Sequence, residues 1–259
     1  GDVAEDGTYT SSIESPGRRF FTMIGTLVQG RVSLDGAAVA ASKLGLNIAI
    51  KYATERRQFN GASDTVEEVL MDYQQHQRRL LPLLATTYAA SFAHDELLAK
   101  FDDVFSGTDD TDENRQDLET LAAALKSLST WHALDTLEEC REATGGAGFL
   151  AENRLTALRS DLDMYVTFEG DNTVLLQLVA KRLLADYAKE FQGADFGVLA
   201  RYVVGQATER TFHRSGLRQI VQTVADTGSE KKSALALRDP RTQHDLLADR
   251  VATMVAEVA

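Results

Sequence analysis

Among the residues that could do chemistry, Glu169 has the most informative neighbours, because Phe168 precedes it and Gly170 follows it. Tyr165, Val166 and Phe168 place an apolar stretch directly before the carboxylate. Desolvation in such a setting disfavours the charged form, which raises the pKa of the carboxyl group and makes it a competent general base. The ordinary interpretation is a loop glutamate near a helix start, where the helix dipole favours negative charge. The apolar neighbours lead us to expect the general base.

A second group lies near the end of a predicted helix, where Arg56 and Arg57 are followed by Gln58 and Phe59. Cations in a last helical turn are favoured by the helix dipole, which explains the charges without a ligand. An arginine in this place can also hold a pyrophosphate through charge-assisted hydrogen bonds. The sequence leaves both interpretations open for Arg56.

A third group is the glycine cluster Gly145-Gly146-Ala147-Gly148. Taken alone, it is best explained as the end of a helix followed by a turn. Glycines also permit a second backbone or a phosphate-bearing ligand to come close, because no Cβ intervenes. The cluster is not a P-loop, since it lacks the lysine and hydroxyl residue that hold phosphate, and no strand precedes it as in a dinucleotide-binding fingerprint.

Composition and charge narrow the classes of function. The 259-residue chain has a net charge of -12, which disfavours nucleic acid and anionic membranes as partners. No apolar run is long enough to span a bilayer, so we expect no stable membrane insertion. None of the 5 histidines pairs with Cys, Asp or Glu at metal-ligand spacing, and we expect no metal site. The single cysteine excludes an internal disulfide and suits a reducing compartment.

Helices are predicted to position these groups, because apolar residues recur at helical spacing from Arg31 onward. Asp64 is expected to cap the second helix, with Glu67 as its capping-box partner, and Pro82 predicts a kink or break within it. A cap at Asp171 or Asn172 begins the fourth helix. The helices are expected over 31–59, 64–100, 113–143, 173–191, 194–226 and 240–258.

These helices and their short connections predict an all-α fold, an up-and-down four-helix bundle with additional C-terminal helices. One buried face of the third helix is predicted from Leu118, Leu121, Leu125 and Leu128. Residues 1–20 are rich in turn residues and predict loop with one or two strands, and the flank before Glu169 is apolar and β-prone. No continuous sheet is expected beyond residue 31.

Taken together, these pieces resemble the acyl-CoA oxidase and acyl-CoA dehydrogenase superfamily, with the oxidase branch closest. The resemblance rests on four stretches in the family's order, which lie within residues 30–185. They are Gly30-Arg31 at a helix start, ATERRQF, CREATGGAGF with its continuation LAENR, and YVTFEGDNTVLLQ. The stretch DYQQHQRRLLPLLATTYA also resembles the second bundle helix of the oxidases.

The resemblance implies a domain organisation. Members of this family have an N-terminal helical domain, a central β-domain and a C-terminal helical bundle, and oxidases carry a further helical region. Residues 1–29 would be the end of the β-domain and a linker, a short remnant of that domain. Residues 30–192 would be the helical bundle, and 193–259 the start of the oxidase-type C-terminal region. The chain is therefore expected to be the C-terminal part of a longer enzyme.

The resemblance also implies a reaction, the oxidation of acyl-CoA to trans-2-enoyl-CoA in fatty acid β-oxidation. FAD would be bound between subunits, so the protein would be a homo-oligomer, at least a dimer. Glu169 would remove the α-proton of the thioester while a β-hydride passes to flavin N5. In oxidases O2 then reoxidises the flavin and yields hydrogen peroxide.

Residue roles carry over by position in the matching motifs. Arg31 would line the substrate site near the thioester, and Gly170 would allow close approach of substrate and flavin. The remaining positions would contact the cofactor: Arg56 at the pyrophosphate of the neighbouring subunit's FAD, Gln58 in place of a threonine of many dehydrogenases, Phe59 beside the cofactor, Gly145 and Gly146 at the adenosine portion of the partner's FAD, and Asp171 and Asn172 after the base.

Two alternatives remain open at this point. One is an acyl-CoA dehydrogenase that passes electrons to an electron-transfer protein. The other is a non-catalytic helical subunit that completes a flavin site on another chain. The chain ends Val-Ala-Glu-Val-Ala rather than in a peroxisomal Ser-Lys-Leu signal, and we expect a cytoplasmic location.

Overall fold

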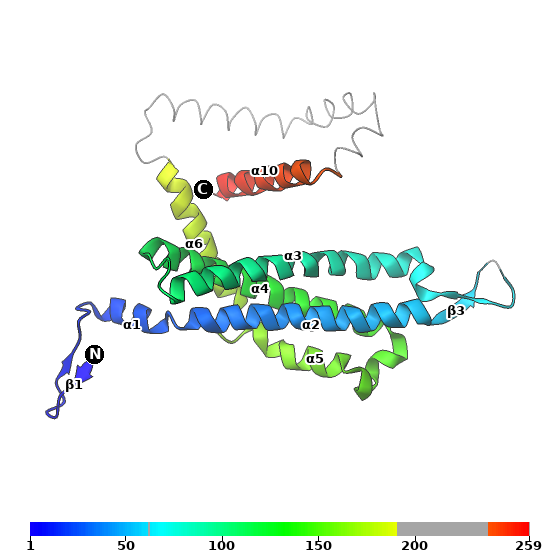
Figure 1. The fold of residues 1–259 in the computed structure, drawn as a ribbon, viewed down its shortest axis with the longest axis horizontal. Helices are drawn as coiled ribbons and strands as arrows, with labels where there is room; N and C mark the ends of the chain where they lie inside the picture. The colour runs from blue at the N-terminus through cyan, green and yellow to red at the C-terminus, as the bar shows by residue number, and fades with distance from the viewer. Residues whose placement is uncertain (62, 191–237, 259) are drawn as a thin grey trace, which may run out of the picture. The chain divides into compact units, whose positions relative to one another are not determined.

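A computed structural model describes residues 1–61, 63–190 and 238–258 (Figure 1). The chain divides into two compact units, 1–179 and 180–259. The expected helical run over 194–226 lies outside the described residues. The α-helices are α1 (Pro16–Ile24), α2 (Leu27–Glu55), α3 (Gln74–Phe105), α4 (Asp112–Ala143), α5 (Leu155–Leu162), α6 (Asn172–Glu190) and α10 (Pro240–Val258).

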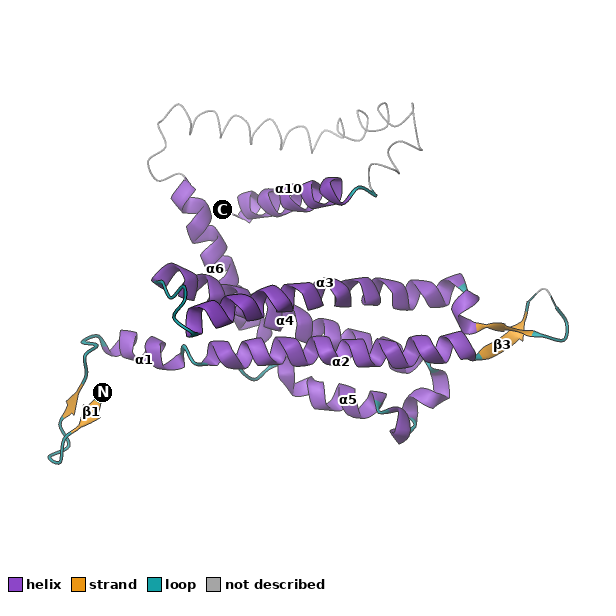
Figure 2. Cartoon of the chain, viewed as in Figure 1, coloured by secondary structure: helices purple, strands orange, loops and turns teal. Residues whose placement is uncertain are grey.

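The expected all-α fold is confirmed, since strands are few and short among the described residues (Figure 2). β1 (Asp2–Val3) pairs antiparallel with β2 (Tyr9–Thr10), which agrees with the one or two strands expected within residues 1–20. A second two-stranded sheet pairs β3 (Arg57–Asn60) with β4 (Glu67–Val69). Short 3-10 turns are η1 (Leu70–Asp72), η2 (Gly145–Phe149), η3 (Ala151–Asn153) and η4 (Asp163–Val166).

The three long helices α2, α3 and α4 lie side by side and enclose two apolar clusters (Figure 1). Small residues on α2 bring α4 close: a Cβ added at Gly45 would lie 2.7 Å from Leu137 Cδ2. One cluster combines Ala38, Ala41, Leu46 and Ala49 of α2 with Leu80, Ala133, Leu137, Cys140, Ala143, Leu155 and Leu162. The other, toward the start of α2, combines Val28, Val32, Leu97, Val104, Leu118 and Ala122. This packing fixes α2 against α4, and both carry site residues.

Between α2 and α3 the structure corrects the sequence prediction. A helix was expected to reach residue 59 and the next to start at Asp64, but α2 ends at Glu55 and α3 begins at Gln74. Asp64 lies in the turn of the β3–β4 hairpin, where its carbonyl accepts a hydrogen bond from Asn60 Nδ2 at 2.6 Å. Glu67 is a strand residue rather than a capping-box partner. The expectation of no sheet beyond residue 31 is therefore wrong at this hairpin, where Gly61 follows β3 as a turn residue.

Pro82 and Leu128 bear on two further expectations about helices. Pro82 lies inside α3 without breaking it, so the expected break is wrong, while the expected kink stays a prediction. Because proline has no N–H, the Arg78 carbonyl lacks its helical hydrogen bond. Arg78 is exposed, so water can donate to this carbonyl instead. Leu128 is 57% exposed, so the buried face of α4 does not follow the leucines throughout. That face instead includes Ala122, Lys126 and Thr130.

Candidate active site

The flank before Glu169 is helical, not β-strand as its composition suggested. α5 ends at Leu162 and η4 covers Asp163–Val166, after which the N–H groups of Thr167 and Phe168 donate to the Met164 carbonyl at 3.0 and 3.2 Å. These local hydrogen bonds outweigh the β propensity of the apolar side chains. The segment ends in a tight turn that carries Glu169.

The Glu169 turn has an unusual backbone. Glu169 has a φ of 57° and Gly170 a φ of 108°. The left-handed region is strained for a residue other than glycine, and such strain concentrates at functional sites. Asp171 then caps α6, since its Oδ1 accepts hydrogen bonds from the N–H groups of Thr173 and Val174 at 2.9 and 3.3 Å. The predicted helix start is thereby confirmed.

The carboxylate of Glu169 lies against the backbone of α2 at Gly30. A Cβ added at Gly30 would lie 2.6 Å from Glu169 Cδ and 2.7 Å from Oε2. Oε2 is buried and has no hydrogen-bond partner among the described residues. The backbone N–H of Glu169 likewise makes no hydrogen bond within the described part of the chain. A strong acceptor and a donor thus remain available on one strained residue.

Arg31 approaches the turn from α2. Its Nε donates to the Glu169 carbonyl at 3.1 Å, and its Nη1 lies 3.8 Å from Glu119 Oε1. Burial lowers the pKa of Arg31, although Glu119 and Glu169 oppose that shift. The sequence expectation placed Arg31 near the thioester, and the structure brings it together with Glu169. Its contact is with the backbone carbonyl of the expected base.

Lys126 of α4 was missed by sequence reasoning. Its Nζ donates to the Gly170 carbonyl at 2.7 Å and to Asn172 Oδ1 at 2.8 Å, and the residue is 0% exposed. Burial lowers its pKa to about 8; nearby Arg31 adds to this shift, while Asp171 and Glu169 oppose it. The signal was present in the sequence, because Lys126 lies four residues after Ala122 on a helix face that is otherwise apolar or small.

Asn172 faces the bundle interior. It is 1% exposed, and its Nδ2 donates to the Ser127 carbonyl at 3.3 Å and to Thr130 Oγ1 at 3.0 Å. Lys126 holds its Oδ1. The side chain, which the resemblance assigned to the cofactor, is therefore fully engaged by α4.

The second predicted group lies just beyond the end of α2. Arg56 follows the helix with an extended backbone, and its exposed side chain has no partner among the described residues. Arg57 differs, since its Nη1 donates to the Glu67 carbonyl at 3.0 Å within the hairpin. Gln58 accepts a hydrogen bond from the Tyr73 hydroxyl at 2.8 Å through its carbonyl. Phe59 is 66% exposed and has a φ of 62°.

The glycine cluster ends α4 as expected. Gly145 has a φ of 57°, and a Cβ added at Gly145 or Gly146 would meet nothing within 4 Å. Gly148 is different, since its added Cβ would lie 2.3 Å from the Arg141 carbonyl. Packing among the described residues therefore requires a glycine at position 148. It does not explain why position 146 is a glycine.

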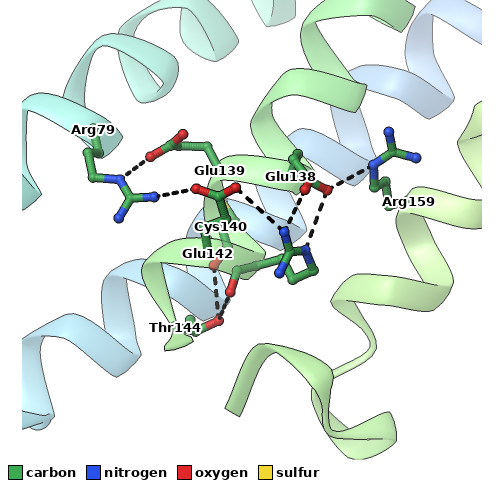
Figure 3. Close-up of polar contacts among 8 residues, drawn as sticks. Arg79, Glu138, Glu139, Cys140, Glu142, Thr144 and Arg159 are labelled. Carbon is green, nitrogen blue, oxygen red and sulfur yellow. Dashed lines mark hydrogen bonds and ion pairs between the residues drawn. The ribbon is translucent and has the colours of Figure 1, made fainter. Parts of the chain in front are cut away.

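Ion pairs fix the last turns of α4 before these glycines. Figure 3 shows Arg79 of α3 reaching both Glu139 and Glu142, with Arg79 Nη2 3.0 Å from Glu142 Oε2. Arg159 of α5 reaches Glu138 at 3.0 Å. Thr144 Oγ1 donates to the Cys140 and Arg141 carbonyls, both at 3.0 Å. These contacts tie the end of α4, just before the glycines, to α3 and α5.

The structure brings one set of the predicted residues together at the Glu169 turn, while the others lie beyond the end of α2 and after the end of α4. Glu169, Gly170, Asp171 and Asn172 form one turn with Arg31, near the start of α2. Arg56, Gln58 and Phe59 lie beyond its other end, and Gly145 and Gly146 follow the end of α4, which runs in the same direction. The 26 residues from Gly30 to Arg56 correspond to about 39 Å at 1.5 Å per helical residue.

Within the described ranges, no group of three or more Cys, His, Asp or Glu side chains is arranged to hold a metal ion. The described helices also include none of the length and apolarity that a membrane crossing requires.

Comparison with known proteins gives a consistent result. Residues 24–184 match the family model described as acyl-CoA oxidase, C-alpha1 domain. The chain is 45% identical over 186 residues to a putative peroxisomal acyl-coenzyme A oxidase 3.2 of Arabidopsis thaliana, covering 72% of this chain and 27% of that protein.

Two solved structures agree with that match. The crystal structure of acyl-CoA oxidase 1 from Yarrowia lipolytica has a TM-score of 0.66 at 30% identity, covering 75% of this chain and 30% of that one. Acyl-CoA oxidase-1 of Caenorhabditis elegans, in complex with FAD and ATP, has a TM-score of 0.60 at 28% identity, covering 72% and 26% of the two chains. The chain thus spans about a third or less of the length of these proteins.

Proposed function

The chain belongs to the acyl-CoA oxidase family, and on that premise we propose that it is the C-terminal helical part of an enzyme that oxidises acyl-CoA to trans-2-enoyl-CoA and reduces O2 to hydrogen peroxide. The observation that carries this proposal is the Glu169 turn. It offers a buried carboxylate oxygen and a backbone N–H that no described residue engages. A general base and a donor to the substrate are what this reaction needs.

Glu169 removes the α-proton of the thioester. Its carboxylate oxygen accepts the proton, and the electron pair of the broken C–H bond forms the new double bond as a hydride leaves the β-carbon. The Glu169 N–H donates to the thioester carbonyl, which stabilises the negative charge that develops there. Arg31 holds the carbonyl of the same residue, so base and donor keep one geometry. The double bond of the product follows from these two bond cleavages.

When bound, FAD would supply the hydride acceptor and the route of the electrons to O2. The residues at the far ends of α2 and α4 suit its phosphates and adenosine portion. The Arg56 guanidinium is exposed and unpaired within the described residues, as a pyrophosphate ligand requires. Gly146 has no neighbour near its missing Cβ, which leaves room for a ligand to lie against the backbone. Gln58 and Phe59 line the same end.

The two places serve different FAD molecules. They are separated by about 39 Å along α2, whereas a flavin ring and its own pyrophosphate are joined only by a five-carbon ribityl chain. Glu169 therefore works on a cofactor whose pyrophosphate is held elsewhere, and Arg56 holds the cofactor of another subunit. A homo-oligomer, at least a dimer, is the arrangement that completes both sites.

Asp171 and Asn172 have a narrower role than the resemblance implied. Asp171 caps α6 with its side chain, and Asn172 is buried against α4. We assign both to the support of the turn rather than to cofactor contact. Gly170 follows Glu169 at a φ of 108°, which a larger residue would not adopt without strain.

The location follows the relatives. The Arabidopsis relative is named as peroxisomal, and this favours a peroxisomal site of action over the cytoplasmic location expected from the C-terminal residues. Oxidation of acyl chains with release of hydrogen peroxide suits a compartment that contains this product.

Anaerobic mixing of the full-length, FAD-loaded protein with an acyl-CoA tests the proposal. Flavin absorbance should bleach, and hydrogen peroxide should appear when O2 is admitted. Glu169→Gln keeps the size of the side chain but removes the base, so bleaching should slow by about 10²–10⁴-fold or more while acyl-CoA still binds. Asp171→Asn is the control. Near-normal bleaching in Glu169→Gln, or bleaching that only an added electron-transfer protein can reverse, would contradict the proposal.

A further inference from the structure

We propose that Lys126 of α4 is a positioning residue for the general base, because its ammonium group and the Arg31 guanidinium hold the carbonyls of Glu169 and Gly170 and thereby fix the direction of the Glu169 carboxylate. This inference rests on the proposed function of Glu169. It adds a residue that no motif around the base contains, since Lys126 lies 43 positions before Glu169 in the sequence.

The contacts are those of a clamp on the turn. Arg31 Nε donates to the Glu169 carbonyl at 3.1 Å, and Lys126 Nζ donates to the next carbonyl, that of Gly170, at 2.7 Å. Lys126 also binds Asn172 Oδ1 at 2.8 Å, and Asn172 is anchored to Ser127 and Thr130 on α4. The turn is thus tied to α2 on one side and to α4 on the other.

Burial makes this arrangement costly unless it has a use. A charged group that is 0% exposed loses its hydration, and Arg31 lies near enough to repel it. Only one of the contacts of Lys126 is needed to satisfy Asn172. The other goes to the turn that carries the base. An apolar residue at this core position would pack α4 with less penalty, so the retained charge points to the geometry of the turn.

Glu169 needs such a hold, because its φ of 57° is unfavourable for a residue with a Cβ. If the carbonyls on either side of Gly170 were released, the backbone could relax toward negative φ. The carboxylate would then leave its place against Gly30, and the N–H would change direction with it. A small misplacement of a reacting group lowers the rate without abolishing substrate binding.

The test compares variants of the full-length, FAD-loaded protein. Lys126→Met keeps an unbranched, flexible side chain but removes its charge and donors. Thr136→Val is the matched control, because Thr136 is also 0% exposed on α4 and lies away from the turn. We expect Lys126→Met to slow flavin reduction by bound acyl-CoA about 100-fold, with little change in KM or FAD content, whereas Thr136→Val leaves the rate unchanged. Lys126→Arg, which keeps charge and donors, should recover part of the rate.

Hydrogen exchange supplies a readout that does not depend on the reaction. The peptide covering residues 167–174 should exchange faster in Lys126→Met than in Thr136→Val. Unchanged exchange there, or equal rates of flavin reduction in the two variants, would overturn the inference. If Lys126→Met does not fold, Lys126→Gln decides, since its amide is one bond too short to reach the Gly170 carbonyl: slowed reduction with FAD retained supports the inference, and the parent's rate overturns it.

Glu169→Gln, measured in parallel, separates this inference from the proposed function. If Glu169→Gln reduces flavin normally, the proposed function fails, and the exchange measurement still decides whether Lys126 holds the turn. If Glu169→Gln is inactive while Lys126→Met matches Thr136→Val, only the positioning role fails.

Discussion

The turn near the start of α2 and the segment beyond its end are built in opposite ways. At the Glu169 turn, side chains from α2 and α4 hold successive backbone carbonyls, and the buried Asn172 anchors the turn to α4. Beyond the end of α2, Arg56 is exposed and has no partner within the described residues. At the end of α4, a Cβ added at Gly145 or Gly146 would meet no atom of the described residues within 4 Å.

The difference is between a turn that the chain itself holds in place and a segment that another subunit would complete. On the proposed function, the chain itself holds the base in place before substrate arrives. The other end is open within the described residues, and its phosphate and backbone contacts would form when another subunit brings a cofactor. Changes at the first place should therefore affect the rate of chemistry, and changes at the second should affect cofactor retention.

The largest effect should come from Gly30→Ala. The added Cβ would lie 2.6 Å from Glu169 Cδ and would displace the carboxylate, so flavin reduction in the full-length protein should slow by about 100-fold. Alanine favours the helix, so thermal unfolding should not shift downward. Gly36→Ala is the matched control on α2, since its Cβ would meet the His94 ring at 2.7 Å, away from the turn. Stopped-flow absorbance measures the rate of flavin reduction. An equal rate loss in both variants would mean that the effect does not come from displacing the Glu169 carboxylate.

Arg56→Ala should have the next largest effect. Loss of a charge-assisted phosphate contact should weaken FAD binding roughly ten- to a hundredfold, while the free energy of unfolding changes little because the side chain is exposed. Arg57→Ala is the comparison, since Arg57 bonds the Glu67 carbonyl within the hairpin. FAD titration of the full-length apoprotein measures both. Equal losses would indicate a general charge effect rather than a specific contact.

A smaller effect is expected at Gly146. Gly146→Ala adds a Cβ that touches nothing within 4 Å, so the apoprotein should keep its stability. FAD affinity should fall about five- to tenfold, or roughly 1–1.4 kcal/mol. Gly148→Ala should do the reverse and destabilise the fold, because its Cβ would lie 2.3 Å from the Arg141 carbonyl. Calorimetric unfolding and FAD titration distinguish the two; an unstable Gly146→Ala apoprotein would mean that this end is closed by the chain itself.

The smallest effect concerns pH and tests how well Lys126 is buried beside the Glu169 turn. The pKa of Lys126 falls from 10.5 to about 8, mainly through burial and further through Arg31, with Asp171 and Glu169 opposing. Between these values the unfolded chain holds a proton that the folded chain has released, so the free energy of unfolding rises with pH. Relative to Lys126→Met, the protein should gain on the order of 1 kcal/mol from about pH 8 to pH 10, measured by urea unfolding. If the difference in the free energy of unfolding between the two proteins stays flat or falls over this pH range, Lys126 is in contact with water.

The long helices of the fold could be predicted because their signals are local, but α5 was not predicted and α1 begins within residues 1–20, which were expected to be loop and strand. Glycine at 145 and aspartate at 171 mark the end of α4 and the start of α6, and both boundaries are observed within a residue or two. The hairpin at 57–69 was missed because its first residues continue the composition of α2. Its strands are stabilised by pairing with each other, which a reading of helical periodicity does not detect.

The site divides in the same way. Glu169 and Gly170 could be found from neighbouring residues, since the turn is written in one short stretch. Lys126 and the anchoring of Asn172 could not, because the partners are more than 40 positions apart and meet only when α4 packs against the turn. A lysine on an apolar helix face was the available signal, and only the packing shows what it binds.

The chain's single cysteine acquires a meaning from the product proposed above. Cys140 is 0% exposed in the bundle core, and burial, with a smaller contribution from Glu139, raises the pKa of its thiol to about 12. Peroxides oxidise the thiolate rather than the protonated thiol. On the proposed function, the sulfur of Cys140 is both protonated and out of reach of the hydrogen peroxide that each turnover would release. Thiol oxidation by its own product should not limit the working life of this bundle.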